Sequence, residues 1–408
     1  MKRAKIYTML LTAVLVFLSV PSRYYANTEH PQPDVVGKYA VSIDAKTGDI
    51  LYDKNANAQA YPASITKVLT AILLMEHVAP GEQIGFSQTA LNQDKSNYQI
   101  EIQPGETIDR DTALMILMVL SANDVAVAIA EHIAGSTEAF SKLMNEKAVE
   151  LGAKNSHFVT PNGLHDPAHI TTPYDMAMIT RGALKYPEIL KAMSTKQTMV
   201  TTSRKTASIF NKATFFELPN FIAGKTGFTD QAHHTLILIN QKDNMEIINV
   251  VMSSHRPDIY NDMNVIANYA FNSFEKQTVL DKATWKKQEK LLDKSVHMEL
   301  ERGSELLLKR GEAKKVQANF EPLQLNDEKL YKDGIHKGEV LGQVRVMKNG
   351  NVLDTVNVLS KDDVAYEKPE PKKPLTFSIE AAALGLLVLC SLAFVVWKVR
   401  RRVKERVM

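Results

Sequence analysis

Cysteine is nearly absent from this chain: Cys390 is the single one among 408 residues. An internal disulfide is therefore excluded. Without cysteine pairs or a His/Glu helix signature, we expect no structural zinc site and no other metal or cofactor. The formal net charge of +3 is small, so the composition does not indicate a nucleic-acid partner. Hydrophobic residues make up 45% and charged residues 23% of the chain, which is typical of a globular protein.

Both ends of the chain carry apolar runs that predict contact with a membrane. Residues 6–20 follow three basic residues and are typical of a secretory signal peptide, which we place at residues 1–26; an uncleaved anchor is the alternative. Residues 377–397 are long and apolar enough for one transmembrane helix, with a buried core helix as the alternative. The basic residues 398–408 predict a cytoplasmic tail. We therefore expect a single-pass cell-membrane protein whose main part is extracytoplasmic.

Three short motifs follow one another: Ser-x-x-Lys at residues 64–67, Ser-x-Asn at 121–123 and Lys-Thr-Gly at 225–227. Each alone is weak, because a second Ser-x-x-Lys occurs at 273–276 and a second Lys-Thr-Gly at 46–48. Neither copy fits the order of the set. No other motif follows the copy at 273–276, and the copy at 46–48 lies in a predicted hairpin turn that precedes any candidate nucleophile. The ordered set predicts an acyl-transfer site with a serine nucleophile, as in penicillin-binding proteins and class A β-lactamases.

Ser64 and Lys67 are the candidate nucleophile and base. Pro62 and Ala63 lead into an apolar segment, residues 65–78, which predicts a buried helix with Ser64 at its N-terminus, where backbone N–H groups converge. Lys67 follows one turn later on the same face. A serine hydroxyl needs a base to become a good nucleophile. Lys67 can be that base only if burial and neighbouring cations lower its pKa; otherwise it is an ordinary solvated lysine.

The second and third motifs supply groups that can handle a substrate. Ser121 lies at a break between two predicted helices and can relay a proton to a leaving amine. Asn123 can bind a substrate amide or simply cap the following helix. Lys225 supplies positive charge and Thr226 a hydroxyl for a substrate carboxylate. Gly227 lets a substrate backbone lie close to a strand, unless the motif is an ordinary turn.

The eleven histidines include no obvious partner for a serine. His165 and His169 have an i, i+4 spacing within a loop, residues 152–173, that is rich in Pro, Gly and His. Pro167 lies between them and argues against a shared helix face, so we expect no metal site there.

The periodicity of the chain predicts a mixed α/β domain followed by a smaller β-rich one. In residues 35–275 strands lie near both ends, at 38–53 and 235–252, with helices between them. This order predicts an antiparallel sheet flanked by helices, with an inserted helical lobe. Residues 277–365 alternate as strands do and predict a small all-β domain. A Pro/Lys/Glu-rich linker at 366–376 would join this β-rich domain to the membrane helix. The β-rich domain and the linker would together act as a stalk.

On these residues the chain resembles a known family, the low-molecular-mass penicillin-binding proteins that are D-alanyl-D-alanine carboxypeptidases of the DacF type. The resemblance covers residues 35–275 and rests on the segments 62–67, 121–124, 131–135, 160–164, 174–177 and 224–227. It implies a penicilloyl-serine transferase (β-lactamase-like) fold, peptidoglycan stem peptides as substrates and acylation by β-lactam antibiotics. The β-rich segment is similar to that family's C-terminal domain.

The resemblance also implies a role for each motif residue in removing a terminal D-alanine. Ser64 would be the nucleophile, Lys67 the general base, and Ser121 with Lys225 the proton relay. Substrate binding would fall to Asn123, Lys225, Thr226 and Gly227.

Two further positions belong to the site that the resemblance implies. The backbone N–H groups of Ser64 and Phe228 would form the oxyanion hole. Arg256 is the nearest candidate for a contact with the substrate carboxylate.

Two other functions remain open from the sequence. A membrane-tethered β-lactamase would need a glutamate to activate the deacylating water; residues 152–173 contain none, and the surroundings of Glu188 do not fit the expected pattern. A non-catalytic cell-wall sensor on the same fold would be expected to have lost motif residues, and none is lost.

Overall fold

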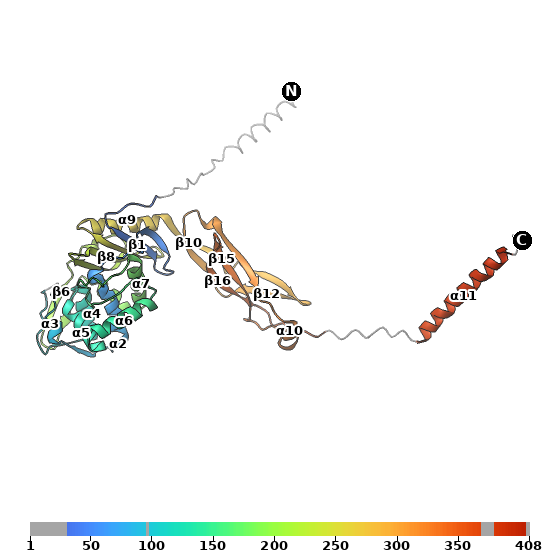
Figure 1. Cartoon of the computed structure of the whole chain (residues 1–408), viewed down its shortest axis with the longest axis horizontal. Coiled ribbons are helices and arrows are strands. Elements are labelled where there is room, and N and C mark those ends of the chain that lie inside the picture. Colours follow the sequence, from blue (N-terminus) through green and yellow to red (C-terminus); the bar gives the residue numbers. More distant parts are fainter. Residues whose placement is uncertain (1–30, 95–97, 369–378, 405–408) are drawn as a thin grey trace, which may run out of the picture. The chain divides into compact units, whose positions relative to one another are not determined.

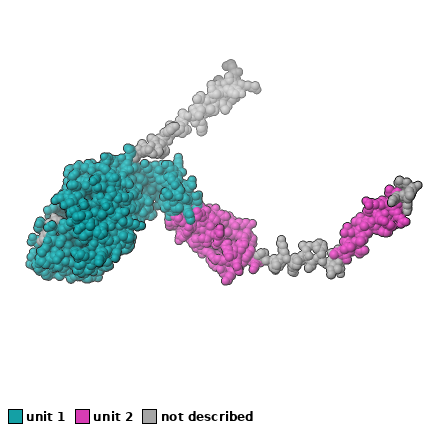
Figure 2. All heavy atoms as spheres, viewed as in Figure 1, with its two compact units in different colours: residues 1–281, 303–319, 345–354 teal, residues 282–302, 320–344, 355–408 magenta. Residues whose placement is uncertain are grey.

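The computed structural model describes residues 31–94, 98–368 and 379–404 (Figure 1). The predicted signal peptide at residues 1–26 lies outside the described residues, as do most of the predicted linker and the last residues of the basic tail. The chain divides into two compact units (Figure 2). The first comprises residues 1–281, 303–319 and 345–354, and the second comprises residues 282–302, 320–344 and 355–408.

A five-stranded antiparallel sheet with the order β2-β1-β9-β8-β7 lies at the centre of the first unit. Strands from both ends of the segment 35–275 therefore pair, as the sequence predicts. β7 is an edge strand, so one side of its backbone has no strand partner within this sheet. The five strands are β1 (Tyr39–Asp44), β2 (Ile50–Lys54), β7 (Phe221–Thr229), β8 (His233–Lys242) and β9 (Met245–Ser254).

Helices cover both faces of this sheet because its strands are apolar on both sides (Figure 1). In β9, Val251 packs in the cluster that contains residues of α9 (Asp258–Ser273), whereas Ile248 and Val250 belong to the main core on the opposite face. α7 (Pro173–Ala183) and α8 (Pro187–Ser194) contact the sheet on that opposite side, next to the central helix α2 (Lys67–His77).

The helical lobe is inserted between β2 and β7. Its centre is α2, whose first eight residues, Lys67 to Leu74, are all buried; a helix that is apolar on all sides is expected to be buried in this way. The lobe contains η1 (Ala63–Thr66), α3 (Gln88–Leu91), α4 (Arg110–Val119), α5 (Asn123–Ala134), α6 (Thr137–Glu150), the two-stranded sheet of β3 (Gln83–Gly85) and β4 (Thr107–Asp109), the hairpin β5 (Gln197–Thr201) with β6 (Thr206–Phe210), and η2 (Phe215–Glu217).

The segment after α9 is rich in strands, as predicted. β10 (Phe274–Leu280) pairs with β13 (Ser304–Lys309). A further five-stranded sheet has the order β11-β12-β16-β15-β14. The remaining elements are β11 (Lys287–Leu291), β12 (Lys294–Leu300), η3 (Ala313–Lys315), β14 (Val316–Pro322), α10 (Asp327–Asp333), β15 (Val340–Lys348) and β16 (Asn351–Ser360).

The last described element is the helix α11 (Ile379–Lys404). Residues 382–403 within it are long and apolar enough to cross a membrane, by length and composition. The helix continues beyond the predicted end at residue 397 into the basic residues.

Candidate active site

The nucleophile turn, defined as residues 62–67, brings Ser64 to the start of the central helix. Ser64 lies in a 3-10 turn that continues directly into α2. The preceding Ala63 is buried and has a φ of 52°, a left-handed conformation that is strained for a residue with a side chain. Thr235 on β8 donates a hydrogen bond from Oγ1 to Pro62 O over 2.9 Å. The sheet therefore helps to hold the turn in this conformation.

Lys67 reaches Ser64 from inside the protein. Its side chain is fully buried, and its Nζ lies 2.9 Å from Ser64 Oγ. The same nitrogen donates to Asn123 Oδ1 over 2.7 Å and to the backbone oxygen of Asn162 over 2.6 Å. A neutral amine has two N–H groups and one lone pair. Because two carbonyl oxygens accept both N–H groups, the lone pair of neutral Lys67 faces Ser64 Oγ, as a general base requires.

The surroundings of Lys67 favour this neutral form. Burial lowers the pKa of Lys67 well below its usual value, and the positive charge of Lys225 lowers it further. The carboxylate of Asp124 acts in the opposite direction and is the weakest of the three influences. The net effect is an amine that can accept a proton from Ser64.

Ser121 and Lys225 form a second pair of hydroxyl and amine. Ser121 lies between α4 and α5 with a φ of 56°. Lys225 Nζ donates to Ser121 Oγ over 2.9 Å and to Thr226 O over 2.7 Å. Lys225 is only 2% exposed, and burial lowers its pKa to about 7. An amine that gains and loses its proton near neutral pH is suited to a relay.

Asn123 does not cap α5, so this alternative from the sequence is wrong. The N-cap is Ala122, and no side chain forms a cap hydrogen bond there. Asn123 is instead buried, where its Oδ1 accepts from Lys67 and its Nδ2 donates to Asp94 O over 2.7 Å. The side chain therefore orients the candidate base and also lines the cleft described below.

The Lys-Thr-Gly motif lies on the edge strand β7 and not in a turn. Gly227 comes so close to the nucleophile turn that a Cβ there would lie 2.8 Å from Ser64 N and would collide with Thr235 Oγ1. Glycine thus permits the contact between strand and turn. Because β7 is an edge, a substrate backbone can add beside it as a further strand. Phe228 follows Gly227 on this strand, so its backbone is near that of Ser64.

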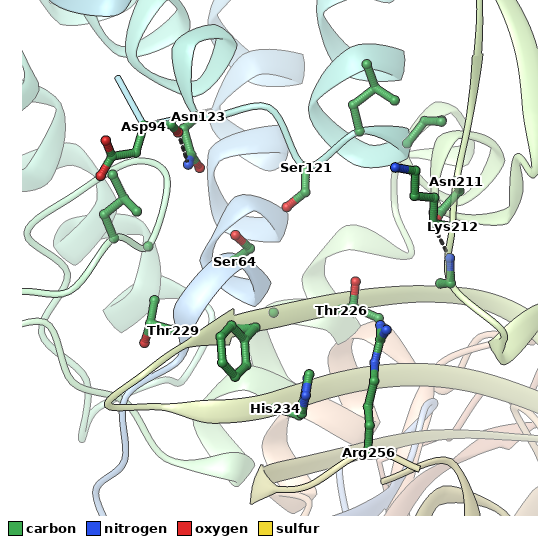
Figure 3. Close-up of a pocket in the computed structure, with 17 residues that line it drawn as sticks. Ser64, Asp94, Ser121, Asn123, Asn211, Lys212, Thr226, Thr229, His234 and Arg256 are labelled. Atoms are coloured by element: carbon green, nitrogen blue, oxygen red, sulfur yellow. Dashed lines mark hydrogen bonds between the residues drawn. The ribbon is translucent and has the colours of Figure 1, made fainter. Parts of the chain in front are cut away.

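A cleft of about 570 Å³ lies over Ser64 (Figure 3). Ser121 and Asn123 line it from the helical lobe, and Thr226 and Phe228 line it from β7. In Figure 3 the hydroxyls of Ser64 and Ser121 extend into the same space. All three motifs therefore converge on one cavity, whereas the second copies lie elsewhere: residues 46–48 are in the turn between β1 and β2.

Positive groups lie at the rim of this cleft. Arg256 follows β9, is exposed and lines the cleft, and its guanidinium lies 5.8 Å from the centre of the Tyr260 ring. Lys212 also lines the cleft. Burial lowers the pKa of His234, and the charge of Arg256 lowers it further. A carboxylate entering from this side would meet favourable charge.

The loop predicted at residues 152–173 supplies Asn162, for which the sequence indicates no catalytic role. Its backbone oxygen is a partner of Lys67, while Asn162 Nδ2 donates to Gln93 Oε1 over 3.0 Å. Gly163 has a φ of 78°, and a Cβ there would collide with Ala63 O. A Pro-Asn-Gly sequence predicts a turn, but nothing in it indicates that a backbone oxygen would contact a catalytic lysine.

His165 and His169 have separate environments. The ring of His165 packs edge-on against Tyr61, with 4.8 Å between ring centres, whereas His169 packs edge-on against Phe158 at 5.5 Å. Within the described part of the chain, no group of three or more His, Cys, Asp or Glu residues is arranged to hold a metal ion.

Comparison with known families decides between the functions left open by the sequence. The model of the D-alanyl-D-alanine carboxypeptidase family of peptidases matches residues 26–256, and that of the penicillin-binding protein 5 C-terminal domain matches residues 271–366.

The chain belongs to the D-alanyl-D-alanine carboxypeptidase family.

Among curated members of this family, the chain is 30% identical over 384 residues to the D-alanyl-D-alanine carboxypeptidase DacF of Bacillus subtilis, covering 88% of this chain and 94% of that protein. It is 24% identical to the carboxypeptidase DacC of Escherichia coli over 86% of this chain and 90% of that protein. The family is one of serine peptidases. Membership in it favours the carboxypeptidase over the β-lactamase and the non-catalytic sensor.

Solved structures agree with this assignment. Penicillin-binding protein 5 of Haemophilus influenzae is 25% identical, with a TM-score of 0.63, and the match covers 82% of this chain and 99% of that one. The peptidoglycan synthesis regulatory factor PBP3 of Streptococcus pneumoniae shares the fold, with a TM-score of 0.67 at 21% identity over 81% of this chain and 100% of that one. The predicted penicilloyl-serine transferase fold is confirmed.

Proposed function

We propose that this carboxypeptidase removes the terminal D-alanine from peptidoglycan stem pentapeptides through an acyl-enzyme on Ser64. The observation that carries the proposal is the buried Lys67, whose Nζ lies 2.9 Å from Ser64 Oγ while two carbonyl oxygens accept its N–H groups. A base held in this way activates a serine without a histidine.

In the acylation step, Ser64 Oγ attacks the carbonyl carbon of the penultimate D-alanine. Its proton passes to Lys67 Nζ as the new C–O bond forms. The developing oxyanion would be bound by the backbone N–H groups of Ser64 and Phe228; the closeness of Gly227 to Ser64 N supports this pairing.

In the second half of this step, the C–N bond to the terminal D-alanine breaks. Ser121 donates its proton to the leaving nitrogen, and Lys225, 2.9 Å from Ser121 Oγ, restores it. Lys67 returns to the neutral form once its proton enters the relay. It can then activate the water that hydrolyses the ester and releases Ser64.

Substrate binding would rest on the edge of β7 and on the positive rim. The peptide backbone would pair with β7 beside Thr226 and Gly227, and Asn123 would face the substrate from the lobe side. The terminal carboxylate would bind Thr226 Oγ1 and Lys225, with Arg256 adding charge from the rim of the cleft.

β-Lactam antibiotics would acylate the same Ser64 and leave slowly. The opened ring keeps its leaving group attached, where it blocks water. A β-lactamase overcomes this with a glutamate near the ester. Among the described residues that line the cleft, the acidic side chain is that of Asp94, and glutamate does not occur.

Attachment to the membrane is part of the proposal. α11 would span the bilayer with its basic C-terminal end in the cytoplasm and the catalytic unit outside. The β-rich segment and the linker would then separate the cleft from the membrane surface.

The test of the proposed function is D-alanine release from diacetyl-Lys-D-Ala-D-Ala by the full chain in detergent. We expect release by the native protein and none by the variant Ser64→Ala. A folded native protein that releases no D-alanine would contradict the carboxypeptidase proposal.

A further inference from the structure

His169 joins the loop that supplies Asn162 to the nucleophile turn. The ring is 2% exposed. Its Nε2 lies 3.0 Å from Thr66 Oγ1, inside the Ser64-x-x-Lys67 motif. Its Nδ1 accepts hydrogen bonds from the backbone N–H groups of Val159 and Thr160, over 2.9 Å and 3.1 Å. One imidazole therefore bridges two segments that are about a hundred residues apart in sequence.

The hydrogen bonds fix the tautomer of this ring. Backbone N–H groups can only donate, so Nδ1 carries no proton. Nε2 therefore holds the hydrogen and donates it to Thr66 Oγ1. Burial lowers the pKa of His169 to about 4, so the ring stays neutral at physiological pH. The charged and titratable groups that act on it are Asp166, His157, His165 and Lys67.

The bridged loop acts directly on the candidate base. Asn162 O accepts from Lys67 Nζ over 2.6 Å, and Pro161 O accepts from Thr70 Oγ1 on α2 over 2.6 Å. Gly163 lies against Ala63 so tightly that no side chain fits. A small shift of this loop would move one of the two oxygens that orient the amine. Misplacement of a catalytic group by about 1 Å can lower a rate about a hundredfold.

We propose that His169 is a positioning residue, which holds Asn162 O against Lys67 by linking the loop at Val159 and Thr160 to Thr66 in the nucleophile turn. This inference rests on the proposed function, because it assigns to His169 a role in aligning the base for Ser64. His169 is not among the described residues that line the cleft over Ser64 and acts through Lys67.

The two halves of the bridge can be removed separately. His169→Asn keeps an acceptor near the position of Nδ1 but loses the donor to Thr66. His169→Gln keeps a donor near the position of Nε2 but loses the acceptor for the loop. Thr66→Val removes the same hydrogen bond as His169→Asn from the other side while keeping the shape of the side chain.

The experiment measures acylation of the full chain in detergent by a fluorescent penicillin, as a function of pH. We expect each of the three variants to be acylated about tenfold more slowly or worse. The double variant Thr66→Val/His169→Asn should be no slower than its slower single variant, because both changes remove one interaction. The acid limb of the profile should move to higher pH, because water that reaches Lys67 relieves the burial that lowers its pKa.

Ser156→Ala is the matched control. Ser156 Oγ lies 2.7 Å from Thr171 Oγ1 and donates to Asp175 Oδ2 over 2.7 Å, at the other end of the same loop. This change should lower the free energy of unfolding but leave the acid limb in place. If the His169 variants behave as Ser156→Ala does, or keep the native rate, the positioning role is wrong. If the native chain is not acylated at all, the proposed function itself fails.

Discussion

Lys67 and Lys225 are ordinary amines whose chemistry comes from their surroundings. Both are buried, at 0% and 2% exposure, and each contacts the hydroxyl of a motif serine. The sequence predicts a buried helix around Lys67, but it indicates neither the two carbonyl oxygens that accept from its amine nor the nearby charge of Lys225.

The variant Lys67→Arg tests the base directly. A guanidinium keeps its charge at every relevant pH and cannot accept a proton, so acylation by penicillin should slow by about a hundredfold to ten-thousandfold. The matched control is Lys46→Arg in the second Lys-Thr-Gly copy, which should be acylated by penicillin at the native rate. If Lys67→Arg also acylates at that rate, Lys67 is not the base.

The buried amine of Lys225 should make the free energy of unfolding depend on pH. Its pKa is about 7 in the folded protein, against a usual value of 10.5, so between these values the unfolded chain binds more protons than the folded one. The free energy of unfolding therefore rises with pH across this window. Lys225→Met removes the group. The stability of the native protein relative to this variant should increase from pH 7 to pH 10, measured by urea unfolding; a constant difference would show an unshifted pKa.

At the scale of elements, the central prediction from the sequence was accurate because it rested on a strong pattern. The apolar segment 65–78 predicts a buried helix, and α2 runs over Lys67–His77. α6 was not predicted, although its buried residues Phe140, Met144 and Ala148 repeat every four positions. The many charged residues of α6 make this narrow apolar face hard to recognise in the sequence.

The loop at residues 156–172 shows what sequence patterns cannot supply. It is irregular, and its contribution to the site comes from the backbone oxygen of Asn162 and the two ring nitrogens of His169. Nothing in the sequence indicates that His169 would lie beside Thr66. Contacts between irregular segments depend on tertiary packing, and they produce no hydrophobic periodicity in the sequence.

The contact between β7 and the nucleophile turn can be tested with one methyl group. A Cβ at Gly227 would lie 2.8 Å from Ser64 N, so Gly227→Ala should push the strand and turn apart and lower the acylation rate about a hundredfold. Gly85→Ala on β3 is the control, because no atom lies within 4 Å of its added Cβ. Equal rates for the two variants would contradict the assigned contact.

At the scale of the whole molecule, the active-site residues named above all precede residue 260, and the candidate membrane helix begins at Ile379. We therefore expect that deleting residues 375–408 yields a soluble enzyme with native activity, measured by ultracentrifugation and D-alanine release. A truncated protein that stays in the membrane after alkaline washing would show that residues 6–20 remain as a second anchor. A soluble but inactive product would show that the helix does more than attach the enzyme.

Ser64 carries the acyl group in the proposed reaction. The most direct measurement is peptide mapping by mass spectrometry after brief treatment of the full chain with penicillin. We expect a stable penicilloyl adduct on the peptide that contains Ser64, and none on the peptide that contains Ser273 in the second Ser-x-x-Lys copy. An adduct at another serine, or rapid turnover of penicillin without a persistent adduct, would contradict this expectation.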